Sequence, residues 1–293
     1  MAESNAHKLG QIIGEALEDS IRPHLMAFAS KHGLYLDQKG PRRCRSSAKV
    51  SWRDINGNSH DLDFVLERGG TDEAQGVPVA FIETAWRRYT KHSRAKAQEI
   101  QGAIEPLVQK YRHISPFKGV VIAGVFTPGA LEQLRSLGFA IVFIAYPVIV
   151  EAFATQGVDI SFDEKTSERE LGKKVQAYRK LSPESRAAIA KVMISAVGLQ
   201  LVEFLKLLEQ AVNRKVTVVR VLALFGKVIE ARSIAEAVRA VENTREGAGG
   251  VHPMHAYELQ VEFGNGDQIN GRFSTKEEAV AFLRRVEPTV LKS

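Results

Sequence analysis

Two acidic residues with the spacing of a divalent-metal site lie in the N-terminal half of the sequence. Asp63 stands near the start of a predicted strand in HDLDFVLERGG, and Glu83 stands near the end of the next in VPVAFIETAW. Adjacent strands lie about 4.8 Å apart, so carboxylates at matched strand ends can share one ion. Mg²⁺ prefers oxygen ligands and completes its shell with water and phosphate oxygens. The pair therefore predicts a Mg²⁺ site that activates water against a phosphodiester, with Mn²⁺ as a substitute ion.

Basic side chains flank this acidic pair on both sides. Segment 38–53 has six cations and no acid, and segment 84–98 has five cations and no acid. These 31 residues hold 11 of the 40 basic side chains, where an even distribution would place about four. The two runs predict contacts with a polyanion, and a solvated surface is the alternative for each run. The expected DNA contacts are Arg42, Arg43, Arg45, Lys49, Arg87, Arg88 and Arg94.

The elements that must position these side chains follow from the apolar periodicity. Helices and strands alternate in a way that predicts a mixed sheet with helices on both faces. The sequence Asn56-Gly57-Asn58 is a hairpin signal between the first two strands. In chain order, we expect a helix at 6–32, strands at 49–54, 61–67 and 77–85, a helix at 93–111, a strand at 118–126, a helix at 129–137 and a strand at 139–146.

The second half of the chain has a different pattern. Residues 165–213 are helical by periodicity, with a start signal at Ser182-Pro183-Glu184. Two similar segments follow, each with two strands and then a helix that begins at a serine or threonine followed by acids. They cover 216–242 and 257–287 and predict a four-stranded sheet with two helices.

Composition excludes several classes of protein. No apolar run approaches the roughly 18 residues that span a bilayer, and the N-terminus lacks an apolar signal-peptide centre. The single cysteine, Cys44, excludes an intrachain disulfide framework and a Cys-rich zinc site. The sequence has no Gly-x-Ser-x-Gly nucleophile motif and no phosphate-binding glycine loop. We therefore expect a soluble, cytoplasmic protein that does not contact membranes.

Over about residues 9–146, the sequence resembles the PD-(D/E)XK nuclease superfamily, which includes restriction endonucleases. The family's core runs helix, three-strand meander, helix, strand, helix, strand, which is the order predicted above. Gly14-Glu15-Ala16-Leu17-Glu18 resembles the pattern of the first helix, Asp63 precedes an apolar strand, and Ile82-Glu83 matches the apolar-acid pair. Lys96-Ala97-Gln98 resembles the pattern of the following helix. The resemblance implies a metal held by Asp63, Glu83 and Thr84, with Glu18 assisting.

The sequence departs from the family motif at the lysine, because Ala85 stands two residues after Glu83. Some family members supply the lysine from a neighbouring element, which here would be Lys91 or Lys96. We favour Lys91, because the loop that follows the strand can fold back over its end. Asp61 is a rival first acid, since Asp61 and Asp63 would share one face of a strand.

Simpler roles remain open for each of these residues. The acids could be surface groups or ion-pair partners of nearby arginines, Lys91 a solvated cation, and Glu18 an exposed helical acid. His60 and His92 could transfer protons. Trp86 and Tyr89 could stack on bases or pack against the first helix.

The predicted fold class is α/β, with a restriction-endonuclease-like mixed sheet flanked by helices and a C-terminal helical and ββα-repeat (α+β) region. We expect a nuclease core at 1–160, a helical connection at 161–213, and a recognition or dimerisation domain at 214–293. The predicted function is a Mg²⁺-dependent double-stranded DNA endonuclease, most like a type II restriction enzyme. We expect a homodimer facing a palindrome, and a cognate DNA methyltransferase as a partner. The alternatives are a non-catalytic DNA-binding protein and a structure-specific repair nuclease.

Overall fold

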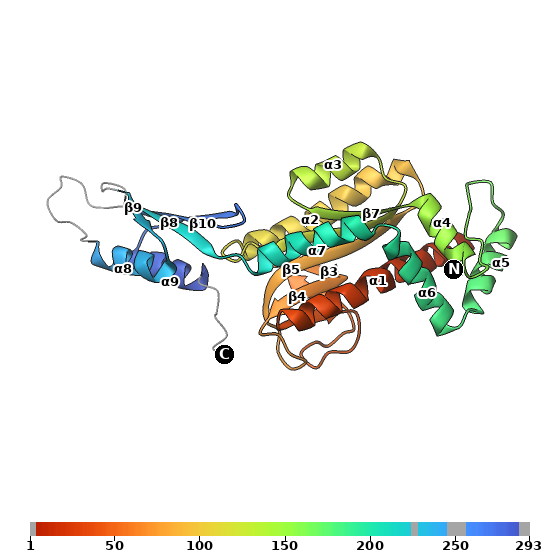
Figure 1. The fold of residues 1–293 in the computed structure, drawn as a ribbon, viewed down its shortest axis with the longest axis horizontal. Helices are drawn as coiled ribbons and strands as arrows, with labels where there is room; N and C mark the ends of the chain where they lie inside the picture. Colours follow the sequence, from red (N-terminus) through yellow and green to blue (C-terminus); the bar gives the residue numbers. More distant parts are fainter. Residues whose placement is uncertain (1–3, 224–227, 245–255, 287–293) are drawn as a thin grey trace. The chain divides into compact units, whose positions relative to one another are not determined.

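The computed structural model describes residues 4–223, 228–244 and 256–286, and the chain forms two compact units (Figure 1). The first unit contains residues 1–110 and 117–209, and the second contains residues 111–116 and 210–293. The division falls close to the predicted boundary at 213. The helices after residue 161, however, belong to the first unit and do not form a region of their own.

A five-stranded mixed sheet forms the centre of the first unit. Its strands, in spatial order, are β1 (Leu34–Gln38), β4 (Phe64–Arg68), β5 (Val77–Arg87), β6 (Phe117–Gly124) and β7 (Ala140–Ala145). The first three strands are antiparallel neighbours, whereas β5, β6 and β7 are parallel. The predicted α/β class is confirmed.

The structure corrects the prediction for the first two strands. The predicted hairpin consists of β2 (Val50–Arg53) and β3 (Ser59–Leu62), which form a separate two-stranded sheet. The first strand of the main sheet is β1, which the sequence reading missed. The predicted strand at 61–67 is divided at Asp63, because residues before it pair with β2 and residues after it pair with β1 and β5.

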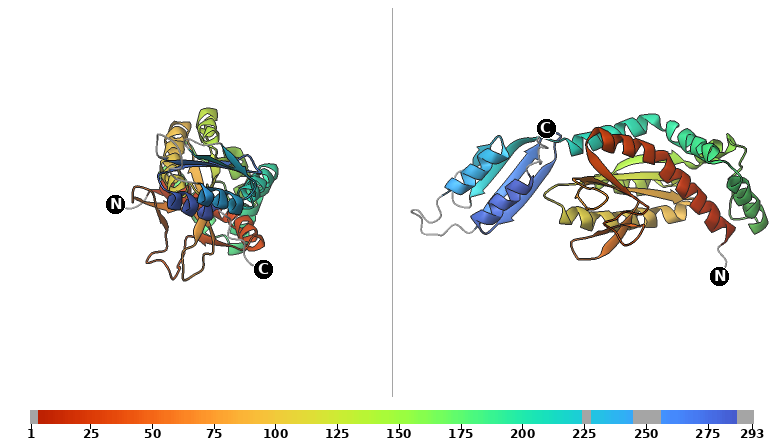
Figure 2. Two further views of the ribbon diagram at one scale, coloured as in Figure 1. Left: turned by 90° about the vertical axis from the view of Figure 1, so that its left-hand side faces the viewer. Right: turned by 90° about the horizontal axis from the view of Figure 1, so that it is seen from below.

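Helices cover both faces of the main sheet (Figures 1 and 2). On one face lie α1 (Asn5–Lys31) and α7 (Gly198–Val212), which an ion pair between Lys31 and Glu209 joins. A Cβ on Gly119 of β6 would lie 2.7 Å from the Phe204 ring of α7, so this glycine permits close packing on that face. On the other face lie α2 (Ser93–Lys110) and α3 (Pro128–Ser136).

The remaining helices complete the first unit. They are η1 (Thr90–His92), α4 (Tyr146–Ala154), α5 (Glu168–Arg179) and α6 (Pro183–Ser195). Both α5 and α6 pack against α1. The predicted start at Ser182 is confirmed, since its hydroxyl accepts a hydrogen bond from the backbone of Ser185. Pro23 lies inside α1, and this helix of 27 residues continues past it to Lys31.

One helix also contacts the edge of the sheet. The side-chain amide of Gln200 in α7 accepts a hydrogen bond from the Phe143 N–H and donates one to its carbonyl. Phe143 lies in β7, the last strand of the sheet. The amide therefore occupies the position that a neighbouring strand would take.

The second unit contains the two predicted ββα segments. Its elements are β8 (Val216–Ala223), β9 (Ile229–Ala231), α8 (Ile234–Asn243), β10 (Tyr257–Phe263), β11 (Gln268–Phe273) and α9 (Lys276–Val286). The strands form one sheet in the order β11-β10-β8-β9. Helices α8 and α9 lie side by side on one face (Figure 2). The alternating burial of β10 shows that its odd-numbered residues face the core.

No single helix within the described ranges has the length and apolarity needed to cross a bilayer. The pair α6 and α7 passes the length and composition test only when taken together, and it is bent by 80°.

Candidate functional site

Asp63 and Glu83 lie next to each other, as the sequence predicts. Asp63 immediately precedes β4, and Glu83 lies in β5, where Ile82 pairs with Phe64. The backbone N–H of Asp63 donates a hydrogen bond to Glu83 Oε1 at 3.2 Å. Both side chains are half-buried. The break between β3 and β4 therefore places the Asp63 backbone where it orients the second acid.

Thr84 orients the first acid. Its backbone N–H and its hydroxyl both donate to Asp63 Oδ2, each at 2.7 Å. The remaining oxygens, Asp63 Oδ1 and Glu83 Oε2, accept no hydrogen bond from the part of the chain that the structure describes. The sequence reading placed Thr84 among the metal ligands, whereas in the structure its side chain holds a ligand candidate in position.

Glu18 adds a third carboxylate to this region. It projects from α1, with 23% of its side chain exposed, and lies 3.7 Å from Arg22. Burial, and after it the negative charge of Asp63, raise the pKa of Glu18 to about 7 against the opposing effects of Lys39 and Arg22. The influence of Asp63 shows that the two carboxylates interact, which an exposed helical acid would not do. Sequence reading missed Lys39 as a neighbour of the site, although it lies in the first basic run.

Glu83 is the most perturbed acid of the group. Burial raises the pKa of Glu83 well above its ordinary value, and the charge of Asp63 adds to this effect. The charge of Lys96 on α2 opposes this shift, and the hydrogen bond from the Asp63 backbone does the same. A divalent ion bound between the two acids would offset both the burial of Glu83 and the repulsion from Asp63.

The donor set suits an ion that needs few protein ligands. Among the residues described, no group of three or more His, Cys, Asp or Glu side chains is placed to hold a metal ion. Mg²⁺ binds through one or two carboxylates and keeps several waters, so the pair Asp63 and Glu83 fits it. A closed structural zinc site of four cysteine and histidine ligands does not fit this pair of acids.

The structure distinguishes between the two candidate lysines. Lys96, with 14% of its side chain exposed, acts electrostatically on Glu83 and binds Glu99 at 2.6 Å. Lys91 is 62% exposed and pairs with Glu164 at 3.0 Å. The preference for Lys91 therefore has no support in its position. The loop after β5 enters η1, and the Lys91 ammonium in it is bound by Glu164.

The rival acid Asp61 belongs to the hairpin. It binds Lys49 and the Ser51 hydroxyl, and these hydrogen bonds lower its pKa. The prediction that Asp61 shares a strand face with Asp63 is wrong, because the strand is interrupted between them. His60 lies in the same hairpin, where its bond to Asp54 lowers the pKa of that carboxyl to about 2.

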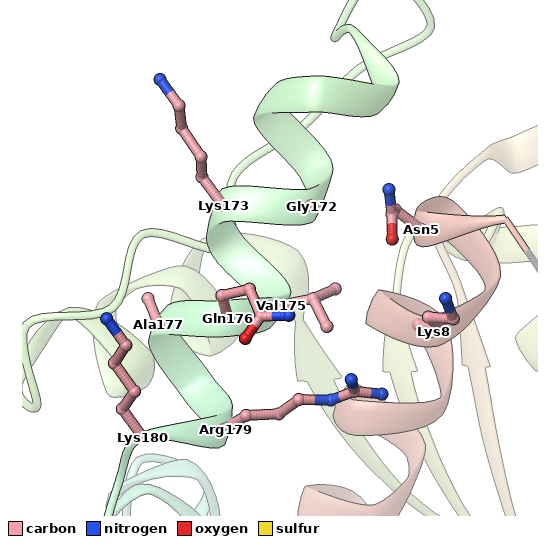
Figure 3. A pocket seen from close by; sticks show the side chains of 9 residues that line it. All are labelled: Asn5, Lys8, Gly172, Lys173, Val175, Gln176, Ala177, Arg179 and Lys180. Atoms are coloured by element: carbon pink, nitrogen blue, oxygen red, sulfur yellow. The ribbon is translucent and has the colours of Figure 1, made fainter.

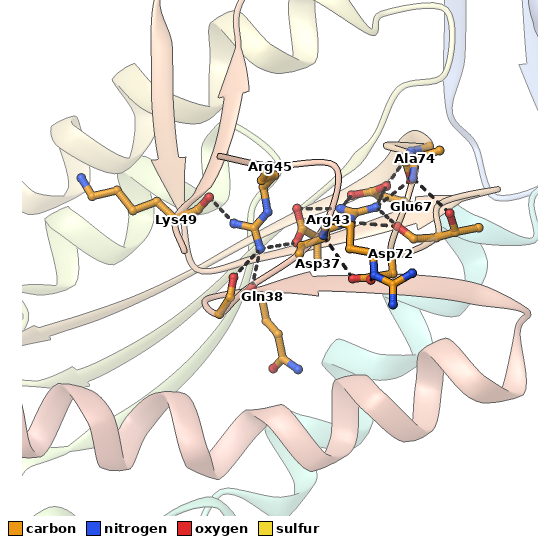
Figure 4. A network of polar contacts seen from close by, with 12 residues as sticks. Asp37, Gln38, Arg43, Arg45, Lys49, Glu67, Asp72 and Ala74 are labelled. Atoms are coloured by element: carbon orange, nitrogen blue, oxygen red, sulfur yellow. Dashed lines mark hydrogen bonds and ion pairs between the residues drawn. The ribbon is translucent and has the colours of Figure 1, made fainter. Parts of the chain in front are cut away.

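Two of the expected DNA-binding arginines are internal. Arg42, with 1% of its side chain exposed, binds the buried carboxylates of Glu67 at 2.6 Å and Asp37 at 2.9 Å (Figure 4). Arg45, 9% exposed, binds Asp37 and the backbone carbonyls of Gln38 and Gly40. Both predictions of DNA contact are wrong, because these guanidinium groups are committed to fixing the loop that follows β1.

The other predicted contacts are half-buried or exposed, and most of them are engaged with protein partners. Arg43 pairs with Asp72 and Glu73, and Arg87 pairs with Glu99. Lys49 binds Asp61, as noted above. Arg88 lies over the Tyr146 ring at 4.0 Å and donates to the Phe162 carbonyl. Arg94, at the start of α2, is exposed, and it forms no ion pair with the residues described.

Trp86 is half-buried and packs against α1. A Cβ on Gly10 of α1 would lie 3.6 Å from its indole nitrogen, and the Tyr146 ring lies 5.8 Å away. Of the two roles left open for Trp86, packing against the first helix is therefore the one observed.

Comparisons with known proteins give no family for this chain. No family model and no curated protein matches the sequence. One solved structure, of a protein of unknown function designated AF1548, shares 12% identity and aligns with 62% of this chain and 98% of its own. The TM-score of 0.29 is too low to support an argument about fold or function.

Proposed function

We propose that the protein is a Mg²⁺-dependent endonuclease that hydrolyses phosphodiester bonds in double-stranded DNA, most like a type II restriction enzyme. The observation that carries this proposal is the contact between Asp63 and Glu83 where β4 pairs with β5, with Lys96 acting electrostatically on Glu83. Each acid retains one oxygen that accepts no hydrogen bond from the described chain. These two oxygens are the expected ligands of the ion.

Each residue has a defined task in this proposal. When bound, Mg²⁺ supplies an activated water and stabilises the charge that develops on the phosphate. Asp63 and Glu83 hold the ion, and Thr84 fixes the Asp63 carboxylate with its two hydrogen bonds. Lys96 places a positive charge beside the reacting phosphate. Glu18 accepts a proton from the site or hydrogen-bonds its water, since its pKa of about 7 allows both forms at neutral pH.

The order of elements supports the same proposal. A helix, a three-strand meander, a helix, a strand, a helix and a strand occur as α1, β1-β4-β5, α2, β6, α3 and β7. This is the order of the PD-(D/E)XK core that the sequence resembles, with the β2–β3 hairpin inserted after the first strand. In this proposal, the second unit contributes recognition or dimerisation, and the protein acts in the cytoplasm as a homodimer beside a cognate methyltransferase.

The test uses Glu83→Gln, which preserves the shape of the side chain and removes its charge. We expect this variant to lose Mg²⁺-dependent cleavage of plasmid DNA and to retain binding to a labelled duplex. Glu132→Gln is the matched control, because this glutamate of α3 is 71% exposed and distant in sequence from the site. Undiminished cleavage by Glu83→Gln would contradict the assignment.

A non-catalytic DNA-binding protein is the second candidate. Ala85 favours it, because this position carries the lysine in the family motif. Wild-type protein that binds DNA in a salt-dependent way but nicks no plasmid with Mg²⁺ or Mn²⁺ would establish this role. Mapping the ends of any cleaved fragments separates a restriction enzyme, which cuts at one sequence, from a structure-specific repair nuclease.

A further inference from the structure

A basic groove lies between α1 and α5, outside the acidic site. Its volume is about 600 Å³, and four of the residues that line it are cations: Lys8, Lys173, Arg179 and Lys180. Figure 3 shows Lys8 projecting from α1 and Arg179 extending from α5 toward it. No acidic residue lines the groove.

These cations have no acidic partners of their own. None of the four forms an ion pair with a carboxylate of the described residues. Of the acids at the start of α5, Glu168 accepts a hydrogen bond from the backbone of Asn5 at the rim of the groove, and Glu170 closes the capping box with Ser167. Lys8 and Arg179 therefore face each other across the groove, whereas Lys173 and Lys180 extend from the outer side of α5 (Figure 3), and an anion bound along this surface would relieve the repulsion between the cations.

The groove is open and its cations are spread along it, and this arrangement favours a polyanion over a small ion. Lys8 comes from α1 and the other three cations come from α5 and its C-cap residue Lys180, which lies seven residues after Lys173. Seven residues of helix extend about 10 Å. Phosphates of a nucleic-acid strand advance about 3.4 Å each along the duplex axis. Such a strand can therefore contact cations at both ends of the groove.

The groove also lies at a suitable distance from the acidic site. Lys8 and Glu18 are on the same helix, separated by ten residues, or about 15 Å of helix. Glu18 interacts with Asp63. Fifteen ångströms correspond to about four phosphates along a duplex. A strand whose scissile phosphate lies at Asp63 could thus pass through the groove a few nucleotides away.

We propose that this groove binds the phosphate backbone of duplex DNA, on the flank of the site that is cut. This inference rests on the proposed function, because it takes the same duplex as its ligand. The contacts are to phosphates and carry no sequence information. They add affinity and hold the duplex in register with Asp63 and Glu83.

The experiment measures DNA binding in a background that cannot cut. Lys8, Lys173 and Arg179 are changed together to glutamine in the Glu83→Gln protein, and the dissociation constant for a labelled duplex is measured across a salt series. The matched control changes Lys31, Lys206 and Arg135 to glutamine, which removes the same charge from exposed positions outside the groove. Circular dichroism and thermal unfolding verify that both variants are folded.

We expect the groove variant to bind about 10-fold to 100-fold more weakly near 0.1 M salt, because each lost phosphate contact lowers the salt slope by about 0.9. The control is expected to bind within about threefold of the parent, since it loses only general charge. Equal affinity and slope in the two variants would overturn the inference, as would the absence of DNA binding by the parent protein. If the wild type cuts nothing but binding depends on the groove, the endonuclease proposal fails and the groove proposal stands.

Discussion

The raised pKa of Glu18 makes a quantitative prediction about stability. In the unfolded chain the carboxyl has its ordinary pKa of 4.5, and in the folded protein the pKa is about 7. Each pKa unit corresponds to about 1.4 kcal/mol, so full ionisation of Glu18 costs the fold up to about 3 kcal/mol. Below pH 4.5 both states hold the proton and the cost is absent. It grows between pH 4.5 and 7, where the unfolded state releases its proton first.

Glu18→Gln removes this cost, because the amide cannot ionise. Relative to wild type, we expect the variant to gain up to about 3 kcal/mol in free energy of unfolding between pH 4 and pH 8. Any constant effect of the amide cancels in that difference. The measurement is urea unfolding followed by circular dichroism in EDTA at several pH values. Glu15→Gln is the control, since Glu15 is an exposed glutamate three residues earlier on the same helix.

Mg²⁺ should oppose the same cost. A cation near Asp63 favours the ionised form of Glu18, so added Mg²⁺ is expected to stabilise wild type more at pH 8 than at pH 5.

A stability difference between Glu18→Gln and wild type that stays constant from pH 4 to 8 would refute the reasoning, because it would show that Glu18 titrates in the folded protein as it does in the unfolded chain.

Two further expectations concern the cations. Lys96→Ala is expected to lower Mg²⁺-dependent plasmid cleavage by on the order of 10²-fold, because it removes the positive charge that acts on Glu83. Lys91→Ala should change the cleavage rate by less than about twofold. Equal losses of cleavage in the two variants would contradict the assignment of Lys96. Arg42→Ala is expected to lower the free energy of unfolding by about 3–5 kcal/mol, because it leaves buried carboxylates without their partner. In urea unfolding, replacing the exposed Arg43 with alanine should cost less than about 0.5 kcal/mol. If Arg42→Ala costs as little as Arg43→Ala, the buried network does not stabilise the fold.

Local sequence patterns predicted the elements of the core well but not their pairing. Asn56-Gly57 specifies a turn and therefore a hairpin, but it does not specify which sheet the hairpin joins. The strand β1 (LYLDQ) was missed because it is short, is half polar and directly follows a helix. Its buried Asp37 is stable only because two arginines from a later loop bind it. No local pattern contains that information.

The candidate site was predicted in part for the same reason. Asp63 and Glu83 were identified because they occupy the ends of strands that are neighbours in sequence and in space. The basic run at 38–53 was misread in part, because a run of cations looks the same whether it is solvated or buried. The acids that bind Arg42 come from β1 and β4, outside that run. The groove cations were missed because residue 8 and residues 173–180 meet only in the folded chain.

The contact of Gln200 with the edge of β7 has a consequence for solubility. An open edge strand presents unpaired N–H and C=O groups that can template pairing with another chain, and β7 (AIVFIA) has the apolar, uncharged composition that favours such aggregation. By satisfying both backbone groups of Phe143, the amide blocks the middle of that edge with a single side chain. Gln200 thus hinders two chains from pairing edge to edge through β7.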